Sequence, residues 1–140
     1  MAKRLDRRFL ENRSGVVAVE FAFIAPVLFL ILCGIICFGL VFSVYNSVQQ
    51  LAAESARASV SGLSAAERDQ LAKSYVTKNV GVYGMLDPQK LSVATNSQGG
   101  TFQVTLTYDM SASPAFKLYN VLASASPTIA RSAAVQNGGF

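Results

Sequence analysis

The pattern of hydrophobic and polar positions divides the chain into an apolar first third and a mixed remainder. From Phe21 to Val44 there are 24 residues without a charge, and 20 of them are apolar. At about 1.5 Å per residue this run makes roughly 36 Å of helix, more than a hydrocarbon core of about 30 Å. The run therefore predicts one membrane-spanning helix. Helical spacing continues to Gly62, so we expect a transmembrane and stem helix over residues 16–62.

The remaining residues, 63–140, predict a small extracytoplasmic head. Ser64-Ala65-Ala66-Glu67 has the form of a capping box and begins a helix over 64–79. Strict alternation over 101–108 predicts an antiparallel strand whose Thr-rich face is exposed to water or to a partner. The other expected elements are a strand from Leu91 to Thr95, a turn at Asn96–Gly100, a short helix after Ser113-Pro114 with Phe116, Tyr119 and Leu122 on its buried face, a strand over Thr128–Val135 and a frayed tail over Gln136–Phe140.

The predicted fold class is therefore α+β. A long N-terminal transmembrane stem helix is followed by a head with a second helix and a three-stranded antiparallel sheet. Beyond Val44, the stem has a small-residue face and no leucine stripe, so we expect it to pack on its own head. The head has no cysteine and so no stabilising disulfide. It must therefore bury apolar surface against this helix or against other subunits.

The net charge of +4 is concentrated before the apolar run. Residues 1–15 carry +3, and residues 16–140 carry only +1, so the sequence has no basic patch for nucleic acid and predicts no such partner. The basic residues of this leader are Lys3, Arg4, Arg7, Arg8 and Arg13. Only Arg57 follows the run closely, so the leader is expected in the cytoplasm and the head on the outer side.

The composition also excludes most kinds of catalytic site. The chain has no His, and its two cysteines, Cys33 and Cys37, lie four apart within the apolar run. Histidine-based catalysis, zinc clusters and Cys–His nucleophiles therefore lack their components, and we predict no enzyme, no cofactor and no metal site. A disulfide within one helix would be strained, so the thiols are expected to be free and buried, with an intersubunit bridge as the alternative.

Glu20 is the residue that a plain membrane anchor does not explain. It lies in a stretch that is otherwise apolar from Val16 to Leu32, and a charge at the bilayer centre costs about 2.5 to 3.5 kcal/mol. One interpretation is that Glu20 lies at headgroup depth and is simply solvated. Another is that the chain is cut after Gly15, because a new amine at Val16 would then lie one turn from Glu20 and neutralise it, within one chain or between subunits.

Ordinary signal cleavage is a third interpretation of the basic leader and apolar run. The nearest small-residue site is Ala56-Arg57-Ala58, well past the run, at a point where the helical pattern still continues. The run is also longer than the roughly 7 to 15 apolar residues of a signal peptide.

A basic leader followed by Gly15–Ala22 (GVVAVEFA), with Pro26 and Gly34 downstream, resembles the TadE-like pseudopilins of the tight-adherence (Tad, or Flp) pilus. The resemblance implies cleavage between Gly15 and Val16 by a prepilin peptidase. It also implies that Glu20 and Phe21 serve peptidase recognition and assembly. Members often carry a second acid near Gly34–Gly39, where this chain has Cys37.

Pro26 lies within the predicted span and removes one backbone donor, so a helix kink is expected there. Such a bend serves filament packing in one interpretation. In the other it reflects the ordinary tolerance of membrane helices for proline.

The function expected from this resemblance is that of a minor pseudopilin in pilus assembly, initiation or tip adhesion. The implied partners are the prepilin peptidase, other pseudopilins, the major Flp pilin, the inner-membrane assembly platform and membrane lipid. The implied location is the bacterial inner membrane, single-pass, with possible incorporation into the pilus. Two alternatives are an unprocessed membrane-anchored binding module and a major pilin subunit, although major Flp pilins are generally much shorter.

Overall fold

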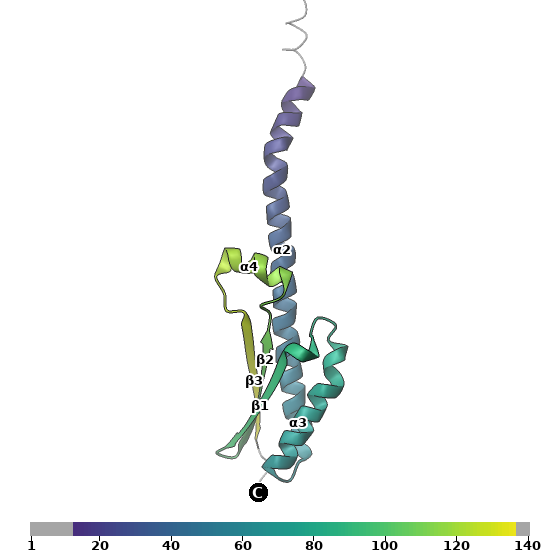
Figure 1. The fold of residues 1–140 in the computed structure, drawn as a ribbon, viewed down its shortest axis with the longest axis vertical. Helices are drawn as coiled ribbons and strands as arrows, with labels where there is room; N and C mark the ends of the chain where they lie inside the picture. Colours follow the sequence, from purple (N-terminus) through teal and green to yellow (C-terminus); the bar gives the residue numbers. More distant parts are fainter. Residues whose placement is uncertain (1–12, 137–140) are drawn as a thin grey trace, which may run out of the picture. The chain divides into compact units, whose positions relative to one another are not determined.

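The computed structural model describes residues 13–136 (Figure 1). The chain divides into two compact units, the first ending at Ile36 and the second beginning at Cys37. The elements in chain order are α2 (Arg13–Ala58), α3 (Ala65–Asn79), β1 (Leu91–Gln98), β2 (Thr101–Asp109), α4 (Pro114–Ala123) and β3 (Thr128–Gln136), with short 3-10 turns at Ser59–Ser61, Val80–Val82 and Pro88–Lys90. The predicted α+β class, with a long apolar helix, a second helix and three antiparallel strands, is confirmed.

The first unit consists, in its described part, of the N-terminal portion of α2. Its large hydrophobic side chains are exposed on every side of the helix, from Val16 to Ile36. A helix that is apolar all round belongs inside a protein or inside a membrane. Among residues 13–136, α2 is the one helix long and apolar enough to cross a membrane.

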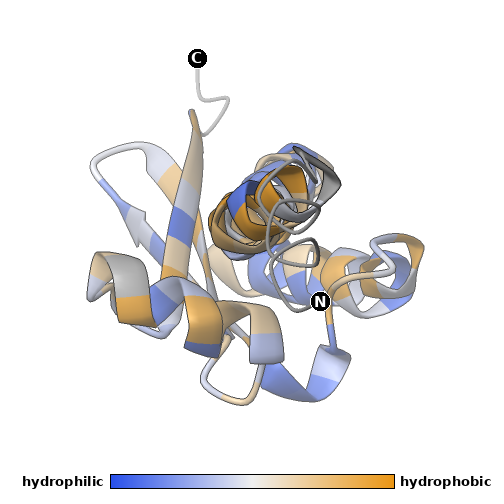
Figure 2. Cartoon of the chain, turned by 90° about the horizontal axis from the view of Figure 1, so that it is seen from above, coloured by the Kyte–Doolittle hydropathy of each residue, from blue (hydrophilic) through white to orange (hydrophobic). Residues whose placement is uncertain are grey.

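The second unit is built around the C-terminal part of α2. Figure 1 shows the three strands along one side of this segment and α3 along another, and the view in Figure 2 agrees. Three elements supply the buried side chains next to the sheet: Val41, Val44, Val48, Leu51, Ala52 and Ala56 come from α2, Ala72 and Val76 from α3, and Phe116 from α4. The expectation that the stem packs on its own head is confirmed.

Small residues let α2 approach its neighbours closely. Ala52, Ser55, Ala56 and Ser59 are all fully buried. A buried hydroxyl needs a hydrogen-bond partner, and each serine finds one within its own helical turn. Ser55 Oγ donates to the Ala52 carbonyl at 2.9 Å, and Ser59 Oγ donates to the Ala56 carbonyl at 2.6 Å. The serines therefore fit a tight interface and leave no hydroxyl unsatisfied.

The sheet has the order β1-β2-β3, with both pairs antiparallel. Phe102, Val104, Leu106 and Tyr108 of β2 are buried, as their alternation predicts. The opposite face of β2 is half-buried, although the sequence pattern predicted an exposed Thr face. That expectation was wrong because β2 is the central strand and residues of β1 and β3 flank its hydroxyl side chains.

Two boundaries of the sheet differ from the predicted ones. Gly99 and Gly100 have φ angles of 59° and 76°, a left-handed conformation that glycine adopts without strain and that suits a two-residue hairpin. Pairing therefore reaches Gln98 and Thr101, so the strand end at Thr95 and the five-residue turn were wrong. Gln136 also pairs with Thr101, so it is not part of a frayed tail, whereas residues 137–140 lie outside the described part.

The helix ends follow their sequence signals closely. Ser64 caps α3 by accepting the Glu67 backbone N–H at 3.2 Å, and the Glu67 carboxylate accepts the Leu63 N–H at 2.8 Å. The capping box is confirmed, with its return bond one residue earlier than the usual form. Ser113 precedes Pro114 at the start of α4, as predicted.

Two of the three residues expected on the buried face of α4 can be checked. Phe116 is buried and Tyr119 is half-buried, whereas the Leu122 side chain lies outside the described residues.

Gly62 ends the stem segment where the chain turns toward α3. A Cβ at this position would lie 2.9 Å from the Arg68 backbone nitrogen, so no side chain fits there without a shift. Arg68 Nε also donates to the Gly62 carbonyl at 2.9 Å. The predicted stop therefore coincides with a close backbone approach.

We predict that Leu51→Ala destabilises the second unit by about 2 to 5 kcal/mol, because it removes a fully buried side chain from a packed interface. Denaturant titration of the full chain in detergent, followed by near-ultraviolet circular dichroism of the tyrosines, measures the change. Gln50→Ala, at the adjacent exposed position, is the matched control and should shift the midpoint little. Equal midpoints for the two variants would contradict the assignment of α2 to the core.

Candidate processing and assembly site

The predicted processing segment lies in the first turns of α2. The helix begins at Arg13, and the leader residues 1–12 lie outside the described part. Gly15, Val16, Glu20 and Phe21 are all exposed. The structure therefore brings the four predicted residues onto two turns of one accessible helix.

Val16 and Glu20 occupy positions i and i+4, and such residues are neighbours on one helix face. The residues around Glu20 are exposed and apolar, among them Val17, Val19 and Phe23. Within residues 13–136, Glu20 forms no ion pair. The segment thus presents a single carboxylate on a hydrophobic surface, one turn after the Gly15–Val16 bond.

Gly15 itself has open surroundings. A Cβ added at this position meets nothing within 4 Å, and the same holds for Gly34 and Gly39 farther along α2. The described part of the fold therefore does not require glycine at position 15.

Pro26 and the two cysteines lie farther along the same helix. The helix assignment continues through Pro26 without a break, and the kink stays a prediction. The thiols are free, as expected, but Cys33 is exposed and Cys37 is half-buried. Burial of the thiols between membrane helices stays a prediction. The described residues contain no cluster of three or more potential metal ligands.

A second polar site joins α2 to α3. Glu54 Oε2 accepts hydrogen bonds from the Tyr75 and Tyr83 hydroxyls, each at 3.0 Å. Tyr75 belongs to α3, and Tyr83 follows the 3-10 turn after it. Glu54 on α2 therefore binds both Tyr75 and Tyr83, which are about two helical turns apart along the chain. We call this three-residue site the Glu54 clasp.

The clasp changes the acidity of both phenols. Burial, followed by the hydrogen bond to Glu54 and its negative charge, raises the pKa of Tyr83 to about 12. The hydrogen bond to Glu54 is the main cause of a raised pKa at Tyr75. Both phenols therefore stay protonated donors throughout the physiological range.

Asp69 makes a similar connection between α3 and the sheet. Its carboxylate accepts from Lys73 Nζ at 2.8 Å and from Thr95 Oγ1 at 2.6 Å. The hydrogen bond from Lys73, followed by that from Thr95, lowers the pKa of Asp69. Asp69 therefore joins α3 to β1.

The model of the TadE-like protein family matches residues 15–57. Over these residues the chain is similar to TadE-like proteins. Proteins of this family are pilus components and not enzymes. No curated protein and no solved structure matches the chain.

The TadE-like match covers the predicted processing segment, the apolar run and nearly all of α2. It begins at Gly15, the first residue of the segment, and ends at Arg57, one residue before the helix ends. It includes Glu54 but none of the tyrosines to which Glu54 is bonded. The head lies beyond the matched residues.

The sequence by itself predicted no role for Glu54. A signal was present, since Glu54 is a carboxylate among the small residues of a face predicted to pack on the head. A charge on such a face needs hydrogen-bond partners when the face is covered. The tyrosines that provide them lie 21 and 29 residues away, a pairing that no local pattern identifies.

We predict that Glu54→Gln lowers the pKa of Tyr83 from about 12 toward its ordinary value of 10.0, because the charge of the acceptor is removed while burial remains. The stability linked to Tyr83 is complete below pH 10 and declines as the pH rises through about 12, since the folded state disfavours tyrosinate. Tyrosinate absorbance during alkaline titration, with Tyr83→Phe to assign the signal, measures both effects. An unchanged titration in Glu54→Gln would show that the clasp does not form.

Proposed function

We propose that this chain is a minor pseudopilin of a Tad-type pilus, inserted once in the inner membrane and matured by removal of residues 1–15. Its contribution is structural, since it is itself the substrate of a prepilin peptidase and then a subunit. The partners proposed for it are other pseudopilins, the major Flp pilin and the inner-membrane assembly platform. The proposal applies to this chain what the TadE-like match supports for the family.

One observation carries the proposal. Glu20 is an exposed carboxylate without an ion-pair partner in the described part of the chain, on a helix that is otherwise apolar around it. In lipid such a group needs a partner of opposite charge. The nearest source is the amine that cleavage before Val16 would create. Cleavage therefore turns an unfavourable charge into a group that pairs within the chain or across to a neighbouring subunit.

The charge distribution supports an orientation with the leader in the cytoplasm. Five basic residues precede the apolar run, and only Arg57 follows it closely. Positive residues are retained on the cytoplasmic side of a membrane. We therefore propose that the Gly15–Val16 bond lies at the cytoplasmic surface of the inner membrane and the head on the outer side. The head remains in the periplasm, or at the cell surface when the subunit is part of a pilus, where initiation or tip adhesion is its proposed role.

We predict that co-expression with a prepilin peptidase yields a chain that begins at Val16, whereas the chain alone retains residues 1–15. Intact-mass spectrometry of membrane-purified protein measures the difference. Gly15→Leu should block cleavage, because leucine holds this turn helical by about 1 kcal/mol more than glycine and places a side chain beside the bond.

Gly39→Leu is the matched control for this experiment, since both glycines have open surroundings and lie on α2. Its cleavage should equal that of the unchanged chain. Protein that keeps its first 15 residues in the presence of an active peptidase would overturn the proposal and favour an unprocessed, membrane-anchored binding module.

We predict that Glu20→Gln is cleaved normally but fails to assemble, because the new amine at Val16 has no carboxylate to meet. Site-specific crosslinking between co-expressed pseudopilins, together with the amount of pilin in sheared fibres, measures assembly. Glu67→Gln, an exposed acid on α3, removes the same charge from the head and serves as the control. Intact fibres and unchanged crosslinks in Glu20→Gln would leave the chain without the proposed charge pairing.

A further inference from the structure

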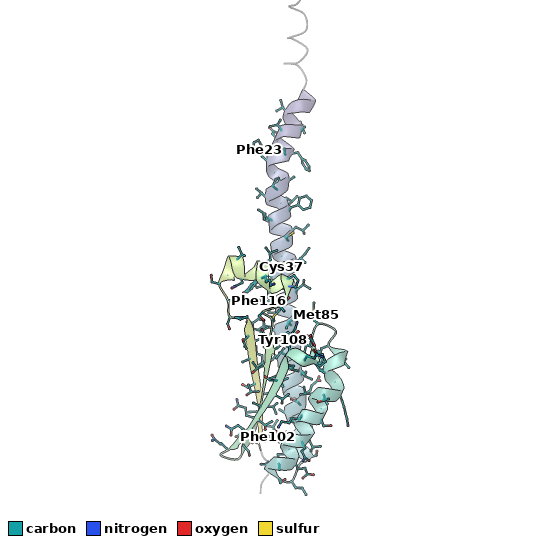
Figure 3. All side chains as sticks on the ribbon, viewed as in Figure 1. Phe23, Cys37, Met85, Phe102, Tyr108 and Phe116 are labelled. Atoms are coloured by element: carbon teal, nitrogen blue, oxygen red, sulfur yellow. The ribbon has the colours of Figure 1, made fainter. Side chains whose placement is uncertain are left out.

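Helix α4 lies beside the final turns of the apolar run. The rings of Tyr119 and Phe38 have centroids 6.0 Å apart, and Phe38 in turn stacks on Phe42 at 6.5 Å. Figure 3 labels Phe116 of α4 close to Cys37 of α2, in agreement with these contacts. The short helix is therefore at the level of residues 37–42.

This level coincides with the outer boundary of the proposed membrane span. A hydrocarbon core of about 30 Å takes roughly 20 helical residues, so a span that starts near Phe21 leaves the core near Leu40. Tyrosine is common at such boundaries, where its ring lies against lipid and its hydroxyl meets water. The aromatic cluster of α2 and α4 thus lies where phospholipid headgroups begin.

The exposed residues of α4 suit the same position. Leu118 and Val121 are exposed, Val121 by 80%, and the exposed Lys117 adds a positive charge. Figure 2 colours several residues of α4 as hydrophobic. Apolar side chains on an exposed helix, accompanied by a basic one, are typical of helices that lie in the headgroup layer.

A pocket of about 330 Å³ opens between α2, α4 and β3. Its walls are partly aromatic and partly polar. The lining consists of Phe38, Val41, Phe42 and Tyr45 on the apolar side, Tyr119 from α4, and Asn46, Gln49 and Arg131 on the polar side. A volume of this size lies at the lower end of the range for ligand pockets, about 300 to 1,000 Å³.

Arg131 supplies the charge of this pocket. It is the single charged residue on the core-facing side of the three strands, in register with the buried Leu106. Its guanidinium carbon lies 4.8 Å from the centroid of the Tyr45 ring. No acidic side chain between residues 13 and 136 forms an ion pair with it. A half-buried guanidinium without an ion-pair partner in the described residues favours an anion from outside, and phosphate matches its planar fork.

We propose that this pocket binds the headgroup phosphate of a phospholipid in the outer leaflet, with Arg131 as its ligand and the acyl chains along Phe38 and Phe42. Charge complementarity identifies the phosphate, and continuity with the apolar run identifies the lipid. The site would fix the depth of the head on the membrane and hold α4 in the headgroup layer. This inference depends on the membrane insertion in the proposed function, but not on cleavage or assembly.

The first test is native mass spectrometry of the full chain released from vesicles of phosphatidylethanolamine and phosphatidylglycerol. The unchanged chain should retain one phospholipid, and Arg131→Gln should reduce the retained fraction about tenfold, the loss of one charge-assisted hydrogen bond. Arg131→Lys should keep most of it. Arg57→Gln removes the same charge from an exposed site on α2 and should have no effect. Equal retention in Arg131→Gln and Arg57→Gln overturns the proposal.

The second test does not depend on the Arg131 variants being folded. A photoreactive benzoylphenylalanine replaces Phe42 in one chain and Val60 in another, both about half exposed, and irradiation follows in the same vesicles. A lipid adduct at position 42 and none at position 60 supports the site. Crosslinks from position 42 to a second copy of the chain, without a lipid adduct, overturn it.

A free anion is distinguished from a lipid by adding inorganic phosphate at millimolar concentration. The lipid should stay bound, because the ion lacks contacts with the aromatic wall, and displacement by phosphate would reassign the pocket to a soluble anion. Carbonate extraction of the same membranes checks insertion separately. A chain that is extracted contradicts the proposed function, whereas a chain that stays inserted but retains no lipid contradicts this inference alone.

Discussion

The burial of the C-terminal part of α2 in the head is the interaction on which the rest of the second unit depends. Val48, Leu51, Ala52 and Ala56 are fully buried and meet the apolar faces of both the sheet and α3. Three strands and two short helices have little core of their own, and the head has no disulfide to compensate. The same helix that is proposed to cross the membrane therefore also supplies the centre of the domain outside it.

That double role explains the change of composition along α2. In the first unit the side chains are large and apolar on every side, as lipid requires of a single helix. In the second unit the covered face changes from valine and leucine to alanine and serine beyond Leu51, which lets the neighbouring elements approach the helix closely. Serine is acceptable on that face, since its hydroxyl is satisfied by the preceding turn.

The few charged groups near the apolar run differ in how they are satisfied. Glu54 has two phenol donors from the head, so its charge is stabilised within the chain. Glu20 and Arg131 have no ion-pair partner in the described residues. We infer that the first is completed by an amine made by cleavage and the second by a phosphate from the membrane. Unsatisfied charge thus indicates where this chain meets other molecules.

The sequence by itself determined the elements whose signals are local. The length of an uncharged run predicts a span, alternation over 101–108 predicts a strand, and Ser64 with Glu67 predicts a helix start, since each depends on spacing along one segment. The predicted processing residues Gly15, Val16 and Glu20 also lie within one short segment, and the TadE-like match covers them. They are recognisable without knowledge of the fold.

Only the tertiary structure decided which distant side chains meet. The clasp of Glu54 with Tyr75 and Tyr83, and the stacking of Arg131 on Tyr45, join residues separated by 21 to 86 positions. The half-burial of the Thr face likewise followed from the central place of β2, which alternation alone does not reveal. Local patterns fix the conformation of a segment, whereas the partners of a side chain depend on how whole segments pack, and that information is spread over the entire chain.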